Sequence, residues 1–180
     1  GLGIPAEPLF RSAVLKKQLF IIVLLVGMLS VTYGFESAPT AATIGDKAPA
    51  FEVKNAHHTF TLDSHKGHYT LVAFWTSKDA QSRITATEYS RWHQQSKNGN
   101  AVEYASINLD EDPVLYREII RQDHLPNRTQ FYAGAALAHN LQTVYGISDH
   151  YGAILIDPDG RIVAANPEKS TLEALNLTQS

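Results

Sequence analysis

The sequence has 180 residues and a formal net charge of −3, with 44% hydrophobic residues and no cysteine. This length suits one folded domain plus an appendage. The slightly acidic balance argues against nucleic acid as a partner, because nucleic acid favours a basic face. The lack of cysteine excludes disulfides, thiolate nucleophiles and cysteine-ligated metal from this sequence.

The N-terminal segment has the pattern of an export signal. Basic residues, the last of them Lys16 and Lys17, precede an apolar run of roughly 11 residues from Leu19 to Leu29, which weakens towards Phe35. A run that short does not span a bilayer comfortably, since about 20 residues are needed, but an extension to Phe35 allows an uncleaved anchor. Residues 1–35 are therefore predicted to be a signal peptide or a signal anchor, with an apolar core at 19–35.

Either form of this signal places the rest of the chain outside the cytoplasm, because the positive charges lie on its N-terminal side. The expected location is the periplasm, or the membrane with the domain facing the periplasm or the extracellular side. Residues 36–43 are small and polar and contain Pro39, which is typical of a linker. The folded domain is then predicted to cover 44–180.

The first half of that domain predicts a hairpin, two strands and a helix. Alternating apolar residues around Asn55–His58 favour the hairpin, and a nearly continuous apolar run favours a central strand covered on both faces. A helix whose apolar and aromatic residues recur every three or four positions follows. The predicted ranges are 51–53 and 59–62 for the hairpin, 70–75 for the central strand, 80–95 for the helix and 102–108 for the next strand.

The second half predicts three helices and three short strands. Asp112 and Pro113 supply an N-cap and a proline in the first helical turn, and Ser170 is expected to cap the last helix. Asp157–Gly160 is a turn signal between two strands. The predicted ranges are 114–122, 137–145 and 170–177 for the helices, and 129–132, 153–156 and 161–164 for the strands. This order predicts an α/β sandwich built on one mixed sheet.

Several local sequences in this order resemble the thioredoxin-like superfamily, and within it the exported TlpA/ResA-type (AhpC/TSA-redoxin) proteins. The segments that carry the resemblance are Ile44–Phe51, Lys66–Gly67, Phe74–Trp75, Ile107–Asp112, Tyr145–Ile147 and Ala153–Ile162. The resemblance implies a thioredoxin-like fold, in which helices flank a central mixed β-sheet and an N-terminal β-hairpin precedes it. It also implies the ancestral activity of a thiol-disulfide oxidoreductase.

The positions that carry this activity in the family are all substituted. The W-C-x-x-C motif aligns so that Asp79 stands at the attacking cysteine and Ser82 at the resolving cysteine. Thr85 stands where these redoxins often have a glutamate, Thr87 replaces a helix-kinking proline, and Tyr151 replaces the cis-proline. Because neither aspartate nor serine can form or resolve a mixed disulfide, the resemblance does not extend to redox chemistry. No cofactor is expected.

Asp79 has two interpretations. A carboxylate at a helix start caps free N–H groups and complements the positive end of the helix dipole, which stabilises the helix by about 0.5–2 kcal/mol. Alternatively, a non-redox enzyme would use Asp79, Ser82 and His150 together, with the histidine as base for a serine nucleophile. The acidic run Asp110–Asp112 is interpreted as a solvated loop that ends in a helix cap.

The histidines suggest a further alternative, a metal-binding envelope protein. His57, His58, His65 and His68 fall in two adjacent predicted loops, and imidazole is a common ligand for zinc and copper.

The function favoured by the sequence is an exported binding or accessory domain of the cell envelope without thiol-disulfide activity. Its partner would be a protein, a peptide or a small ligand, not nucleic acid, and the membrane would be a further partner if the signal stays uncleaved. The groove candidates lie around the helix start and the facing loop: Trp75, Lys78, Asp79, Ser82, His150 and Tyr151.

Overall fold

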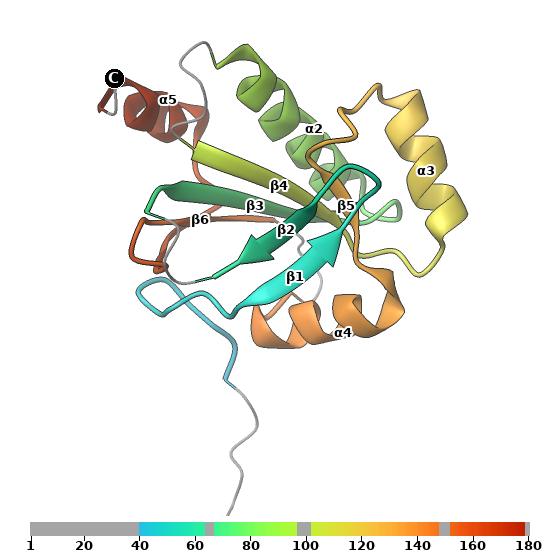
Figure 1. Cartoon of the computed structure of the whole chain (residues 1–180), viewed down its shortest axis with the longest axis horizontal. Coiled ribbons are helices and arrows are strands. Elements are labelled where there is room, and N and C mark those ends of the chain that lie inside the picture. Colours follow the sequence, from blue (N-terminus) through green and yellow to red (C-terminus); the bar gives the residue numbers. More distant parts are fainter. Residues whose placement is uncertain (1–39, 64–66, 97–101, 148–151, 179–180) are drawn as a thin grey trace, which may run out of the picture. The chain divides into compact units, whose positions relative to one another are not determined.

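The computed structural model describes residues 40–63, 67–96, 102–147 and 152–178, and these belong to one compact unit that starts at Pro39. A five-stranded mixed sheet forms its centre, in the order β5-β4-β3-β6-β7 (Figure 1). The pairs β3–β4 and β4–β5 are parallel, whereas β3–β6 and β6–β7 are antiparallel. The strands are β3 (Tyr69–Trp75), β4 (Val102–Asn108), β5 (Gln130–Tyr132), β6 (Ala153–Ile156) and β7 (Ile162–Ala165).

The central strand β3 has apolar side chains on both faces, because both faces are covered. Val72 and Phe74 belong to one buried cluster, and Leu71, Ala73 and Trp75 belong to the other. Successive side chains of a strand point to opposite faces, so an unbroken apolar run is what a doubly covered strand requires. The sequence prediction of a central buried strand is confirmed.

A separate hairpin and one helix cover the first face. The hairpin consists of β1 (Phe51–Lys54) and β2 (Thr59–Leu62), and its alternate residues are buried. The helix is α4 (Gly134–Val144), whose buried Leu141 belongs to the same cluster as the hairpin. This arrangement explains the strict alternation of apolar residues in the hairpin, since only one side of it faces the sheet.

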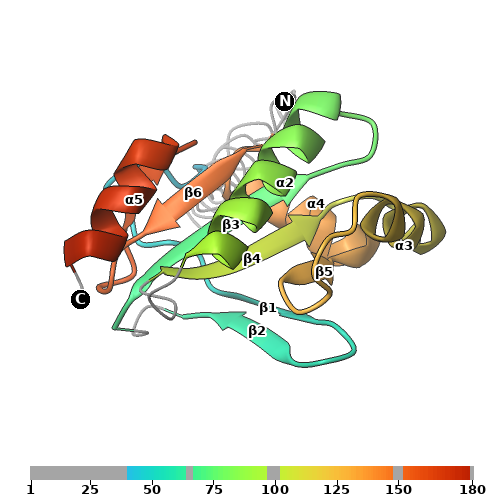
Figure 2. The ribbon, with the colours of Figure 1, turned by 90° about the horizontal axis from the view of Figure 1, so that it is seen from above.

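Three helices cover the second face, α2 (Ala80–Gln95), α3 (Pro113–Gln122) and α5 (Lys169–Thr178). The helix α2 lies between α5 and α3 in both views (Figures 1 and 2). It buries Ala86, Tyr89 and Trp92 against this face of the sheet. The fold class that the sequence predicts, a mixed sheet flanked by helices with an N-terminal hairpin, is confirmed.

The predicted boundaries hold for β2, α2, β4 and β6, and the other elements differ by one residue at one or both ends, except α4, whose start differs by three. The helix α4 begins at Gly134, three residues before the predicted start. Ser170 lies inside α5 instead of capping it, because the helix already begins at Lys169. Within the predicted linker, the N–H of Ala42 donates to the carbonyl of Val144 (2.9 Å), so that residue contacts the domain.

No helix in the described ranges is long and apolar enough to cross a membrane. The predicted signal segment, residues 1–35 with its apolar core at 19–35, lies outside the described residues.

Candidate functional site

The candidate site lies where β3 ends and α2 begins, at the loop that the sequence analysis aligns with the W-C-x-x-C motif of the redoxins. Asp79 is the N-cap of α2, with extended backbone dihedrals (φ −105°, ψ 101°). Its Oδ1 accepts a hydrogen bond from the backbone N–H of Gln81 (3.1 Å). The carboxylate therefore satisfies one of the free N–H groups of the first turn, which supports the interpretation of Asp79 as a cap.

Ser82 is held by two hydrogen bonds in the first turn of the helix. Its side chain is buried, with 2% of the residue exposed. The hydroxyl donates to the carbonyl of Asp79 (3.0 Å) and accepts from the N–H of Thr76 (3.3 Å). Since its only proton already points to a backbone carbonyl, Ser82 is arranged as a structural residue and not as a nucleophile paired with a base.

Thr85 and Thr87, which the sequence analysis aligns with a glutamate and a proline of the redoxins, also belong to the helix. Thr85 accepts a hydrogen bond from the side-chain amide of Gln81 (3.4 Å), and the hydroxyl of Thr87 donates to the carbonyl of Arg83 (2.8 Å). Threonine keeps the backbone N–H that proline lacks, so α2 continues as one helix of 16 residues.

A buried carboxylate on the neighbouring strand fixes the loop before α2. Asp110, which follows β4 and is 6% exposed, accepts hydrogen bonds from the N–H of Ser77 (3.0 and 3.1 Å) and from its hydroxyl (3.0 Å). The side-chain amide of Asn108 donates to the same carboxylate (2.7 Å). The interpretation of Asp110 as part of a solvated loop is therefore wrong, because its oxygens are used inside the protein.

Trp75 does not line an open groove, which corrects the sequence analysis. It is fully buried (0% exposed) and packs beside Tyr116, with ring centroids 6.3 Å apart. The indole Nε1 has no hydrogen-bond partner among the described residues. A side chain at the last position of a doubly covered strand stays inside the core when a helix such as α3 covers that end of the sheet. Of the groove candidates that the structure describes, Lys78 is exposed and Asp79 is half-buried.

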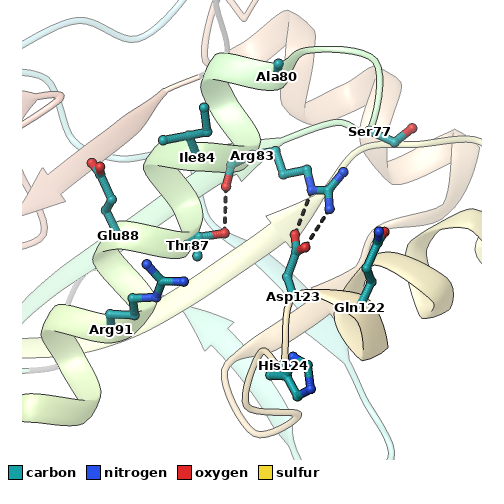
Figure 3. Close-up of a pocket in the computed structure, with 10 residues that line it drawn as sticks. All are labelled: Ser77, Ala80, Arg83, Ile84, Thr87, Glu88, Arg91, Gln122, Asp123 and His124. Carbon is teal, nitrogen blue, oxygen red and sulfur yellow. Dashed lines mark hydrogen bonds and ion pairs between the residues drawn. The ribbon is translucent and has the colours of Figure 1, made fainter.

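A hollow of about 540 Å³ begins at this loop and follows α2 (Figure 3). Ser77 and Ala80 lie at one end of it, and Gln122 and His124 at the end of α3 form another wall. A bidentate ion pair crosses the hollow from α2 to α3: Arg83 donates to the carboxylate of Asp123 through Nε (2.6 Å) and Nη2 (2.5 Å).

This ion pair sets the electrostatics of the hollow. The hydrogen bonds from Arg83 lower the pKa of Asp123, although burial acts in the opposite direction. Both side chains are partly exposed, 31% for Arg83 and 19% for Asp123, so solvent screens the pair in part.

Three further sequence-predicted candidates fall in the ranges that the structure leaves out. His150 and Tyr151 lie outside the described residues, and so does His65. The proposed grouping of Asp79, Ser82 and His150 therefore stays a prediction where His150 is concerned. Its other two members, Asp79 and Ser82, lie within one helical turn of each other.

Two of the four histidines suggested as metal ligands are brought into one groove by the fold. His58 and His68 line a groove of about 850 Å³, together with His93 of α2 and Glu103 of β4, which the sequence analysis did not single out. His68 contacts the Glu103 carboxylate (3.0 Å), and burial lowers the pKa of His93. Within the described ranges, no three histidine or carboxylate side chains are grouped closely enough to hold a metal ion, and His57 is not among the groove residues.

Comparison with known proteins agrees with this geometry. The model of the AhpC/TSA family matches residues 44–165, about two thirds of the chain. The chain belongs to the AhpC/TSA family. No curated protein sequence matches it.

Solved structures place this AhpC/TSA-family chain among thioredoxin-like folds. A thioredoxin-like protein from Parabacteroides distasonis is 28% identical, over 76% of this chain and 96% of that one, with a TM-score of 0.64. The thioredoxin domain of a thiol-disulfide oxidoreductase from Bacteroides vulgatus is 22% identical over 77% and 97%, with a TM-score of 0.63. A thiol-disulfide oxidoreductase from Bacteroides fragilis is 23% identical over 74% and 98%, with a TM-score of 0.60. The last two similarities concern the fold alone.

The ion pair across the hollow leads to a prediction about pH. A carboxyl group whose pKa is lowered by folding stabilises the protein above its unfolded pKa, and this contribution is lost as the pH falls through the folded value. We expect Asp123→Asn to lower the free energy of unfolding by about 1 kcal/mol at pH 7. The difference from the wild type should shrink below about pH 4, as measured by urea unfolding at both pH values. Asp159→Asn, which changes an exposed carboxyl group, is the control, and a difference that stays constant with pH would contradict the assignment.

Proposed function

We propose that this AhpC/TSA-family chain is an exported binding protein that has no thiol-disulfide activity. The observation that carries the proposal is the state of the two positions that align with the reactive cysteines. Asp79 caps α2 and Ser82 is buried in two hydrogen bonds, and the whole sequence has no cysteine. Thiol exchange requires a thiolate, so the site has kept the fold's helix start and lost the chemistry.

The hydrogen bonds of Ser82 also disfavour a non-redox enzyme at the same place. A serine nucleophile donates its proton to a base, whereas this hydroxyl donates to the carbonyl of Asp79. The carboxylate of Asp79 is itself engaged with the N–H of Gln81. In the described part of the site, neither side chain has a titratable partner that would activate it.

Binding is the role that the remaining surface supports. Lys78 is exposed directly before the helix start, and Ser77 and Ala80, which flank this segment in the sequence, line the hollow. A rigid helix start next to a concave surface is a common place for recognition, because a scaffold that already holds the contacting groups in place reduces the entropy lost on binding. We propose that a protein, peptide or small ligand of the cell envelope is held there.

Export is supported by the sequence of the N-terminal segment. Its basic residues and the apolar run from Leu19 to Leu29 fit a signal peptide or an anchor. The proposed location is the periplasm or the outer side of the membrane to which the chain is anchored.

Restoring the cysteines tests whether Asp79 and Ser82 are the reactive positions of the fold. Residues i and i+3 of a helix lie about 5–6 Å apart, which is within the span of a disulfide. We expect Asp79→Cys/Ser82→Cys to form an internal disulfide under mild oxidation, seen by mass spectrometry as the loss of two hydrogen atoms. Neither single variant can form this bond. A double variant that folds but keeps two free thiols would show that the alignment of these positions is wrong.

Photo-crosslinking in the cells that produce the protein tests the binding role. A photoreactive amino acid at position 78, beside the helix start, should give a discrete crosslinked product with a partner. The matched control is position 54, where the lysine side chain is 69% exposed on the hairpin. Equal labelling at both positions, or no product at position 78, would refute a binding site at the start of α2.

A further inference from the structure

The outer face of α2 carries a continuous exposed stripe. Its members recur at spacings of three and four residues, the repeat that places side chains on one side of a helix. They are Gln81, Ile84, Glu88, Arg91 and Gln95. The helix is the middle one of its face, between α3 and α5 (Figure 2), so this stripe lies at the centre of a three-helix surface.

Hollows accompany the stripe on both sides. The hollow of about 540 Å³ separates α2 from the end of α3, and a second one of about 500 Å³ separates α2 from Leu172 of α5. Glu88 and Arg91 line both hollows. The middle of α2 is therefore a ridge with a groove on each side, the relief that packs against a similar helix when ridges enter grooves.

The side chains of this ridge are exposed, although Gln81 donates to Thr85 and the charge of Arg91 helps to lower the pKa of Asp123. Ile84 is a large apolar residue with 52% of its surface exposed. Glu88 and Arg91 form no ion pair with any residue that the structure describes, and their charged ends point apart in Figure 3. The ridge thus presents one negative and one positive charge, one turn apart, near the centre of a 16-residue helix.

We propose that two copies of this chain associate through α2. Two antiparallel helices related by a twofold axis that passes between Glu88 and Arg91 place Glu88 against the partner's Arg91, and Arg91 against the partner's Glu88. A twofold interface requires such a self-complementary patch, because the same surface serves both copies. The two opposite charges on one ridge meet this requirement. A different partner protein with charges of one sign would pair with only Glu88 or only Arg91.

This arrangement leaves the start of α2 accessible. At about 1.5 Å per residue, the axis lies about 16 Å along the helix from Asp79. The partner's α2 would lie along this ridge, and the flanks towards α3 and α5 would add to the area that α2 alone provides towards the roughly 800 Å² per copy of a standard interface. The inference does not depend on the proposed function.

Charge-swap variants test the interface on the full 180-residue chain. The measurement is sedimentation equilibrium in a density-matched non-ionic detergent, which the apolar residues 19–29 require. We expect the wild type to be a dimer. The dimer's dissociation constant should be at least about tenfold higher for Glu88→Arg or Arg91→Glu, because each substitution places like charges opposite each other at both symmetry-related contacts. The double variant Glu88→Arg/Arg91→Glu should recover the wild-type value, since the pairs are restored with their signs exchanged.

Mixing the two single variants gives the decisive result. One copy then carries two arginines and the other two glutamates, so a one-to-one heterodimer should form more tightly than either variant forms a homodimer. Lys47→Glu, an exposed charge reversal away from α2, is the control and should leave dimerisation unchanged. A wild-type monomer at about 200 μM, a concentration at which even weak specific complexes form, would overturn the proposal. A dimer whose dissociation constant is the same for the wild type and both single variants would also overturn the proposal, because the contact would then lie on another surface.

Discussion

The carboxylate of Asp110 joins two parts of the chain on which the candidate site depends. It holds the N–H and the hydroxyl of Ser77 from 33 residues away, and so ties the end of β4 to the loop that leads into α2. Hydrogen bonds to a buried carboxylate are among the stronger ones in proteins, and leaving such a group unpaired would be costly. The direction in which α2 leaves the sheet therefore rests on this contact.

The substitutions at the reactive positions form one consistent set. Asp79 satisfies an N–H at the helix start, Ser82 bridges Thr76 and the first turn, and Thr87 keeps the helix unbroken. Each of these side chains in the described part of the site has a structural partner, which is consistent with the proposed conversion of the site to a scaffold. A fold can in this way persist without the chemistry of its family, and we propose that this chain uses it for binding.

The sequence predicted the features that depend on local signals. The caps at Asp79 and Asp112, the alternation in the hairpin and the apolar run of β3 each act within a few residues, and the structure agrees with them. It did not predict the role of Asp110 or the pairing of Arg83 with Asp123, because those contacts join residues 33 and 40 positions apart. The sequence left Trp75 open between core packing and the groove for a similar reason, since only the position of α3 decides whether the end of the strand is covered.

The most direct test of the central claim is the stability of Asp79→Ala. Side chains kept for catalysis or ligand binding often reduce stability, so their removal leaves it unchanged or raises it, whereas removal of a cap lowers it. We predict that urea unfolding will show a loss of about 1 kcal/mol for Asp79→Ala, with Asp79→Asn much closer to the wild type, because asparagine also caps helices. A variant as stable as the wild type, or more stable, would contradict the claim that this position has become structural.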